Sequence, residues 1–267
     1  TANSSHTYDV AKALTANGYE RKYTVTYNHN YTGSTNTSRT ATYTFNGWAT
    51  SASGAKAYNN SQSVTNLSSS NGATVTLYAN WSSASVNYAP SRTGYIFGGW
   101  YKEAACTNKV SDATYTPTSN ITVYAKWIAN NYTVTYNYNN ATGNKEETSK
   151  TVTYDSTYGT LPAPTRNYLV TFNSKGGNDC DSLIATWNFE GWYNGNTRVD
   201  QNTKVTTASN HTLTASWSGG TITLPTPTRE GYTFGGWYSE EQFTNKVENS
   251  KQYTSAITLY AKWTANT

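Results

Sequence analysis

The chain repeats one tryptophan-centred pattern, and this repetition limits the folds open to it. Each copy joins a Gly-Trp segment to a closing segment that ends in Trp: residues 45–48 and 77–81, 94–101 and 121–127, 189–193 and 213–217, and 231–238 and 257–263. The strongest copies read GYIFGGWY with ITVYAKW and GYTFGGWY with ITLYAKW. Such a chain is predicted to fold as an array of small similar units, each in contact mainly with its neighbours.

The copies fall into two modules whose sequences match over most of their length. We predict a first module over 1–130, with sub-units at about 1–81 and 82–127. The second module spans 131–267, with sub-units at about 131–217 and 218–263. Residues 1–9 match residues 147–155, and only the second module has the earlier strand pattern YTVTYN at 132–137. We therefore expect that the first module lacks its N-terminal strand and that further copies precede it in a longer parent protein.

Composition excludes several classes of function. Charged residues make up only 13% of the chain and aromatic residues 15%, and the formal charge of +4 is spread thinly. The absence of a cluster of Lys or Arg argues against nucleic acid as a partner. Since no apolar run is long enough to cross a bilayer, we predict no direct membrane insertion.

Alternating patterns predict strands almost throughout, with little helix. In residues 121–127, Ile121, Val123, Ala125 and Trp127 share one face of the predicted strand, which places the closing Trp in a core. We extend this argument to eight structural core residues: Trp81, Phe97, Trp100, Trp127, Trp217, Phe234, Trp237 and Trp263. The Gly-Gly before Trp100 and Trp237 indicates a β-bulge. The one helix candidate is the Asp-capped segment 9–16.

Tyrosines that follow the Gly-Trp tryptophans are the candidate ligand-binding residues: Tyr101, Tyr193 and Tyr238. A flat Tyr or Trp ring stacks on a sugar ring, while nearby Asn and Thr bond its hydroxyls. The competing interpretation, which we favour, is that small units use these rings for packing.

Residues for other chemistry are sparse. His6, His29 and His211 have no partners at ligand spacing, and Asp179 and Asp181 supply too few oxygens for calcium, so we predict no catalytic residue, metal or cofactor. The two cysteines occupy non-equivalent places in the repeat, which favours free thiols, with a disulfide between modules as the alternative: Cys106 and Cys180.

In combination, these motifs resemble the Listeria–Bacteroides repeat, also called the internalin B-type B repeat. The resemblance is carried by residues 224–238 with 257–263, and by residues 90–95 through 127. It implies small β-grasp (ubiquitin-like) units, strung in tandem in secreted surface proteins of bacteria. The resemblance also implies a role as stalk or spacer modules, contact of some members with host surfaces or glycans, and no catalytic residues to carry over.

We therefore interpret the chain as a non-catalytic repeat region of a bacterial cell-surface protein, extracellular and attached to the cell wall through other parts of its parent. Its expected partners are neighbouring repeats. One alternative is a carbohydrate-binding or host-adhesion module that uses exposed Tyr or Trp on host or cell-wall glycans or surface proteins. An enzyme of unknown type is the least favoured interpretation. A minor hypothesis is that Lys126 and Lys262 form covalent cross-links. Both lysines are predicted on the strand face opposite Trp127 and Trp263.

Overall fold

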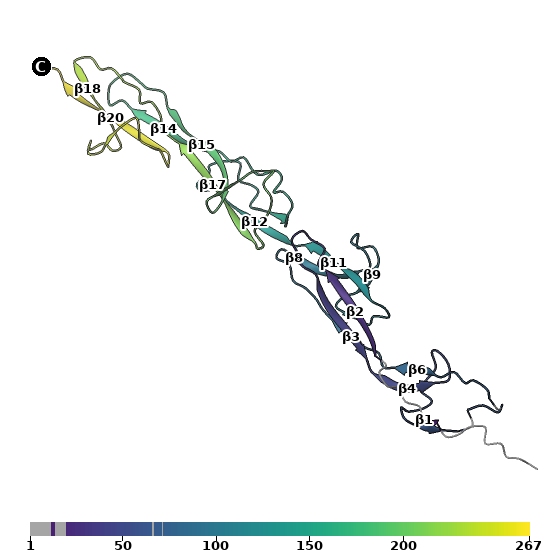
Figure 1. Cartoon of the computed structure of the whole chain (residues 1–267). Helices are drawn as coiled ribbons and strands as arrows, with labels where there is room; N and C mark the ends of the chain where they lie inside the picture. Colours follow the sequence, from purple (N-terminus) through teal and green to yellow (C-terminus); the bar gives the residue numbers. More distant parts are fainter. Residues whose placement is uncertain (1–11, 14–19, 66, 71) are drawn as a thin grey trace, which may run out of the picture. The chain divides into compact units, whose positions relative to one another are not determined.

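The computed structural model describes residues 12–13, 20–65, 67–70 and 72–267, which form strands and turns without any helix (Figure 1). The mainly β class predicted from the sequence is confirmed. Most of the helix candidate at 9–16 lies outside the described residues, and its described part, Lys12–Ala13, is a short strand. The chain divides into two compact units, residues 1–128 and 129–267.

The strands of unit 1 are β1 (Lys12–Ala13), β2 (Arg21–Asn28), β3 (Thr37–Tyr43), β4 (Phe45–Ala49), β5 (Ser63–Val64), β6 (Tyr78–Trp81), β7 (Val86–Asn87), β8 (Tyr95–Tyr101), β9 (Lys109–Ser111), β10 (Thr114–Tyr115) and β11 (Ile121–Ala129). Five of them form one sheet in the order β3-β2-β11-β8-β9. The described residues also form three two-stranded sheets, β1-β5, β4-β6 and β10-β7. In the five-stranded sheet, β2 and β11 run parallel.

The strands of unit 2 are β12 (Asn131–Asn137), β13 (Ser149–Thr153), β14 (Arg166–Asn173), β15 (Leu183–Asn194), β16 (Thr197–Val199), β17 (His211–Gly219), β18 (Tyr232–Tyr238), β19 (Lys246–Val247) and β20 (Ile257–Ala265). They form a single sheet in the order β13-β12-β17-β15-β14-β20-β18-β19, with β16 paired to β15. Two pairs are parallel, β12 with β17 and β14 with β20. The long strand β15 joins the two halves of this sheet.

Strand pairing in unit 2 groups the chain into two interleaved repeats. The β12 repeat contains β12, β13, β16, β17 and the second half of β15, and the β14 repeat contains the first half of β15 with β14, β18, β19 and β20. The hairpin that β14 forms with the first half of β15 therefore comes before β17, the closing strand of the β12 repeat, in the chain. The sub-unit limits at 131–217 and 218–263 remain a prediction, and β14 pairs with β20 across the limit between them.

Unit 1 follows the same order in the part that is described. The β2 repeat contains β2, β3, β8, β9 and β11. Between its hairpin and its closing strands lies the β4 repeat, of which β4 and β6 form a pair. β3 and β4, separated only by Thr44, take the place that the two halves of β15 take in unit 2.

A bulge in the Gly-Trp segments of β4, β15 and β18 explains why Phe and Trp three residues apart both reach the core. Strict alternation would place Phe234 and Trp237 on opposite faces of β18. The register of β18 against β20 shifts between Phe234 and Gly236, where Gly236 has a φ of 112°. The two rings then meet edge to face at 5.5 Å. The bulge predicted before Trp237 is therefore confirmed, and β15 carries the same shift at Gly191.

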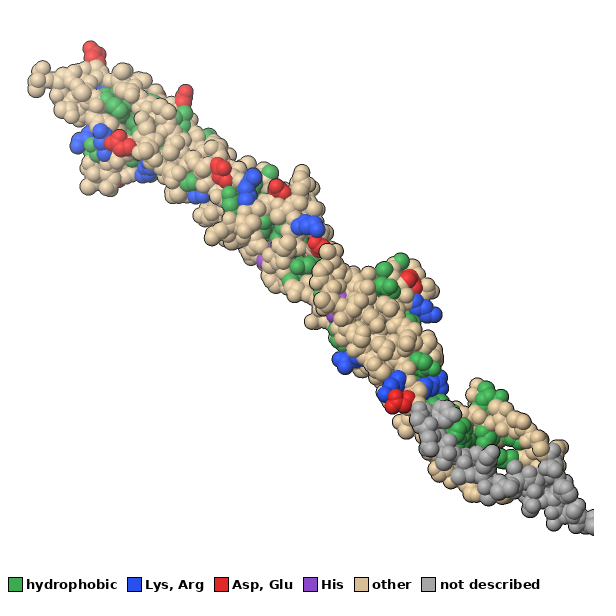
Figure 2. All heavy atoms as spheres, in the orientation of Figure 1, with side chains coloured by type: hydrophobic (Ala, Val, Ile, Leu, Met, Phe, Trp, Pro, Cys, Tyr) green, Lys and Arg blue, Asp and Glu red, His purple; other side chains and the backbone are tan. Residues whose placement is uncertain are grey.

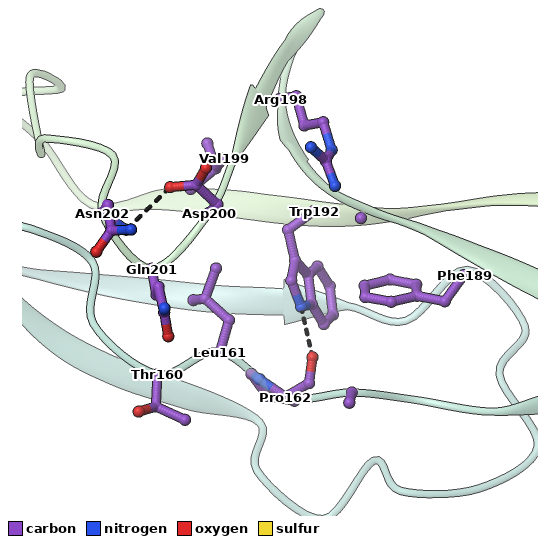
Figure 3. Close-up of a pocket in the computed structure, with 12 residues that line it drawn as sticks. Thr160, Leu161, Pro162, Phe189, Trp192, Arg198, Val199, Asp200, Gln201 and Asn202 are labelled. Carbon is purple, nitrogen blue, oxygen red and sulfur yellow. Dashed lines mark hydrogen bonds between the residues drawn. The ribbon is translucent and has the colours of Figure 1, made fainter.

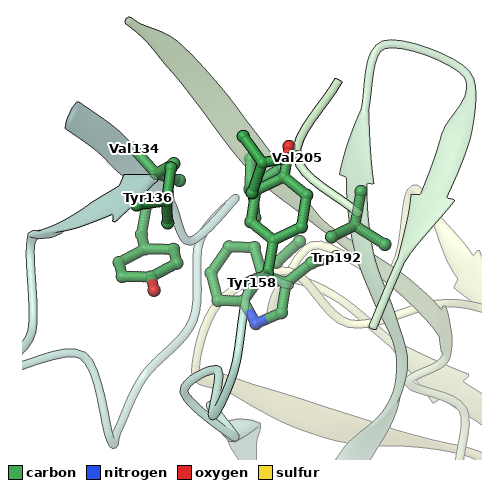
Figure 4. Packing of buried hydrophobic residues seen from close by; sticks show 9 residues of the cluster. Val134, Tyr136, Tyr158, Trp192 and Val205 are labelled. Atoms are coloured by element: carbon green, nitrogen blue, oxygen red, sulfur yellow. The ribbon is translucent and has the colours of Figure 1, made fainter. Parts of the chain in front are cut away.

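Each of the β2, β12 and β14 repeats has its own aromatic core. In the β12 repeat, Trp192 packs among Val134, Tyr136, Tyr158 and Val205 (Figure 4). The structure places the predicted core residues Trp100 and Trp237 at fully buried positions. The other six are half-buried and pack against the three clusters: Trp81, Phe97, Trp127, Trp217, Phe234 and Trp263.

Candidate functional site

The indole N–H groups of the repeated tryptophans are engaged within the protein. The Gly-Trp tryptophans Trp100, Trp192 and Trp237 donate to carbonyl oxygens of the preceding connector at 2.7, 2.8 and 2.7 Å. The closing tryptophans donate to a carbonyl just after the first strand of their repeat: Trp127 to His29, Trp217 to Tyr138 and Trp263 to Ser174. These hydrogen bonds fix each ring and occupy its only donor.

Two of the three candidate tyrosines are covered by neighbouring side chains. Tyr101 is only 8% exposed, and the Lys126 ammonium lies 5.3 Å from the centre of its ring. Tyr238 is half-buried, with Lys262 Nζ at 5.2 Å from the ring centre and Phe243 packed edge to face. Each lysine therefore makes a cation–π contact on the face of the sheet away from the core. The minor cross-link hypothesis for Lys126 and Lys262 stays untested.

Tyr193, the third candidate, lies in a different setting. It is half-buried and lines a shallow recess together with residues of its own turn, Gly195 and Asn196, and of two other segments: Asn139, Thr214, Ala215 and Ser216. Ser216 stands opposite Gly191, where Lys262 stands opposite Gly236 in the β14 repeat. The recess thus combines one aromatic ring with hydroxyl and amide groups. The three tyrosines belong to three different repeats, so they do not form one site.

A second depression, which the sequence analysis missed, lies over the Gly-Trp bulge of the β12 repeat (Figure 3). Leu161, Pro162 and Phe189 form its apolar part, and the segment Arg198–Asn202 forms its polar rim. Trp192 contributes little surface because it is only 2% exposed. Two features of the sequence could have indicated this depression: the Pro-containing connector before β14 and the Gly191-Trp192 pair. The packing of the connector on the bulge, however, follows only from tertiary structure.

The acidic group on this rim is held by its own turn. The Asp200 carboxylate accepts hydrogen bonds from the Thr203 hydroxyl and the Asn202 N–H, each at 2.9 Å. These bonds hold its pKa below the ordinary value, with the Thr203 hydroxyl as the main cause. A lowered pKa keeps Asp200 ionised, which suits a turn or a polar contact and does not suit a general acid.

Equivalent glutamates in the β2 and β14 repeats brace a loop in the same way. Glu103 Oε1 accepts the backbone N–H groups of Thr107 at 2.9 Å and Asn108 at 2.7 Å, as well as the Thr107 hydroxyl. These hydrogen bonds, led by the Thr107 hydroxyl, lower the Glu103 pKa to about 2. Glu240 accepts a hydrogen bond from the Ser239 hydroxyl and makes the corresponding bonds to Thr244 and Asn245. These hydrogen bonds, led by that of Ser239, also lower the Glu240 pKa. Both carboxylates therefore act as loop caps.

The described histidines contact tyrosine hydroxyls. His29 Nε2 lies 2.9 Å from the Tyr88 hydroxyl, and burial lowers the His29 pKa. His211 Nε2 lies 2.7 Å from the Tyr158 hydroxyl. His6 lies outside the described residues.

Cys106 and Cys180 carry free thiols, and burial raises the pKa of each. Among the residues described, no three His, Cys, Asp or Glu side chains gather where they could hold a metal ion. The same part of the chain contains no helix that is long and apolar enough to span a membrane.

Comparison with known proteins identifies the repeat. The Listeria-Bacteroides repeat domain matches residues 7–80, 68–126, 132–167, 185–216 and 217–262. Two proteins of Evansella cellulosilytica, both named as candidate membrane proteins and one of them as Gly-rich, are 30% and 28% identical to this chain over 202 residues. Internalin H of Listeria monocytogenes is 31% identical over 134 residues.

These alignments cover 66%, 66% and 49% of this chain but only 28%, 21% and 20% of the three relatives. The chain thus spans well under a third of the length of each relative. No solved structure gives a significant match. Because the repeat matches extend over most of the chain, in agreement with the Gly-Trp and closing motifs, the chain belongs to the Listeria-Bacteroides repeat domain family.

Proposed function

We propose that the chain is a non-catalytic stalk or spacer in a secreted bacterial surface protein, where it displays or joins functional domains outside the cell. In this proposal each repeat is a β-grasp-like unit without the usual helix. The parallel pair at the centre of the β2, β12 and β14 repeats, flanked by two antiparallel strands, supports that assignment. Its partners are neighbouring repeats, and other parts of the parent protein attach it to the cell wall.

The observation that carries the proposal is the sharing of β15 between two repeats. Residues 183–187 of this strand pair with β14, and residues 187–193 pair with β17 across the bulge, so that Trp187 has a partner on both strands. A tether between domains has to transmit force without coming apart, and a shared strand joins the two repeats through backbone as well as side chains. The unit is then expected to resist force as one body.

The strand directions favour such resistance. β12 is parallel to β17, β17 is antiparallel to β15, β15 is antiparallel to β14, and β14 is parallel to β20. The first strand β12 and the last strand β20 therefore point the same way. Force applied at the two ends of unit 2 pulls along the strands, so that the ladder hydrogen bonds are loaded together and not one at a time.

The surface also suits an extracellular spacer. On the face shown in Figure 2, charged side chains lie singly or in small groups, and most of the visible surface is backbone and uncharged polar side chain. The five ion pairs among the described residues are all largely exposed, as in Lys204 with Asp155 at 2.9 Å. The free energy of unfolding should then depend little on ionic strength, because exposed ion pairs contribute little to stability.

Single-molecule stretching of the whole chain tests the proposal. Unit 2 covers residues 129–267, and a chain of that length extends to roughly 500 Å. We expect unit 2 to open in one high-force step of about that length. A matched variant with a flexible Gly-Ser insertion at Asn188, between the halves of β15, should give two shorter steps. Two independent steps, or opening at negligible force, in the natural chain would contradict the spacer mechanism.

Carbohydrate or host-surface binding is the second candidate function, and the Tyr193 recess is the observation that favours it. Its ring, amide and hydroxyl groups are the types that hold a sugar. A glycan array probed with the whole chain, its Tyr193→Ala variant and Tyr238→Ala as the matched control tests this function. Selective binding that only Tyr193→Ala abolishes would establish it, and silence across the array would leave the spacer.

A further inference from the structure

The closing strands of three repeats share one pairing. Each lies parallel to the first strand of its repeat, and its first residue faces the central Val of that strand: Ile121 faces Val25, His211 faces Val134 and Ile257 faces Val170. Two residues later, Val123, Leu213 and Leu259 face the aromatic residues Tyr27, Tyr136 and Phe172. The core residues of these closing strands are covered as a result.

The fourth closing segment, residues 75–81 of the β4 repeat, lacks this partner among the described strands. β6 pairs with β4 on one side, and no described strand lies on its other side. The motif alignment makes Val75, Leu77 and Ala79 equivalent to Ile257, Leu259 and Ala261. Its apolar residues should therefore face the same kind of neighbour.

The apolar residues of the fourth closing segment are more exposed than their equivalents in the paired closing strands. Leu213 and Leu259 are 0% exposed, whereas Leu77 is only half-buried and Val75 is 41% exposed. The Gly-Trp residue of this repeat, Trp48, is also only half-buried. Exposed apolar side chains beside an unpaired strand edge form a template for strand addition.

We propose that the free edge of β6 receives, in parallel, a strand of the β12 type, supplied by a segment ahead of Thr1 in the same parent polypeptide. The incoming strand has the pattern Tyr-x-Val-x-Tyr, its Val opposite Val75 and its second Tyr against Leu77. The three relatives are several times longer than the region matched to this chain, which leaves room for such a segment in the parent polypeptide. The inference rests on the repeat organisation and is independent of the stalk role.

The sequence offers a direct way to supply this strand. Residues 1–9 match residues 147–155, which include β13. A copy of residues 129–146, placed ahead of Thr1 in the whole chain, therefore adds the β12 strand in its natural order. The matched control carries the same extension with Val134→Lys and Tyr136→Lys in the added copy only. Hydrogen exchange of residues 75–81 is the readout, with residues 213–217 of the unaltered β12 repeat as internal reference.

We expect the extension to slow exchange at 75–81 by roughly tenfold or more, and the control extension to leave it unchanged. Equal exchange in the natural, extended and control chains would overturn the proposal, as would equal protection by both extensions. Protection at 75–81 that already equals the reference in the natural chain would show that the edge is filled from within. Protection that rises with protein concentration would assign it to a second copy, and either result overturns the proposed source.

Discussion

The bulge glycine before Trp237 offers the sharpest test of how the sequence specifies this fold. Gly236 has a φ of 112°, a conformation that residues with a side chain rarely adopt. The adjacent Gly235 has no positive φ, and a Cβ added there would come no closer than 3.4 Å to any neighbour. Gly236→Ala and Gly235→Ala thus add the same methyl group one residue apart, under opposite backbone constraints.

The expected cost at Gly236 comes mainly from the backbone. A side chain held in a glycine-only region costs about 1–3 kcal/mol. An added Cβ would also lie 2.6 Å from Lys246 Cε, but that is the far end of a flexible side chain and can move aside. We therefore expect Gly236→Ala to destabilise the β14 repeat by about 1–3 kcal/mol, and Gly235→Ala to change it by less than about 0.5 kcal/mol.

Hydrogen exchange on the whole chain measures this effect repeat by repeat. A loss of 1–3 kcal/mol corresponds to exchange about 5 to 140 times faster in β18 and β20. The β2 repeat, in the other unit, provides the internal standard. Equal exchange in the two alanine variants would refute the reasoning, because it would mean that the bulge conformation does not depend on glycine.

Other predictions follow from the same contacts. Glu103 has a pKa of about 2 in the folded protein against an ordinary 4.5. The stability that it contributes is therefore present above pH 4.5 and is lost as the pH falls toward 2. In thermal melts at a series of pH values, Glu103→Gln should reduce the loss of stability of unit 1 over this range. The Tyr136 hydroxyl is buried with no partner among the described residues, whereas the equivalent residue in the β14 repeat is Phe172. Tyr136→Phe should raise the free energy of unfolding of unit 2 by about 1 kcal/mol and Phe172→Tyr should lower it, both in urea titrations. A fragment ending at Gly219 keeps every strand of the β12 repeat but removes β18, β19 and β20. Exchange protection should persist in β12 and β17 and vanish in β14. A folded peptide 220–267 would contradict the interleaving.

Local structure was predictable because its signals lie within a few residues of each other. Apolar and threonine residues alternate in β2, in β12 and in the second half of β14, and each closing strand keeps its core residues at every second position up to its Trp. The pair of glycines before Trp237 marked the bulge. In each case a residue's conformation or facing is decided by its immediate neighbours, so the amino-acid sequence alone carries the information.

Long-range pairing was not predictable in the same way. Nothing near Val170 indicates that its partner is Ile257 and not His211, since both closing strands have the same pattern. The covering of Tyr101 and Tyr238 by lysines also depends on which strands become neighbours. Similar repeats make this problem harder, because every first strand fits several closing strands equally well by composition.

The interleaving of the β12 and β14 repeats follows from the physics of small cores. A unit of this size buries a small share of its surface and is marginal on its own. By placing the hairpin of the β14 repeat before the closing strand of the β12 repeat, the chain shares the continuous strand β15 between the two repeats, so that neither small unit has to be stable on its own. The same logic explains why the free edge of β6 stands out: within the described residues it is the one closing strand without a parallel partner, at the place where every other repeat is closed by a strand from earlier in the chain.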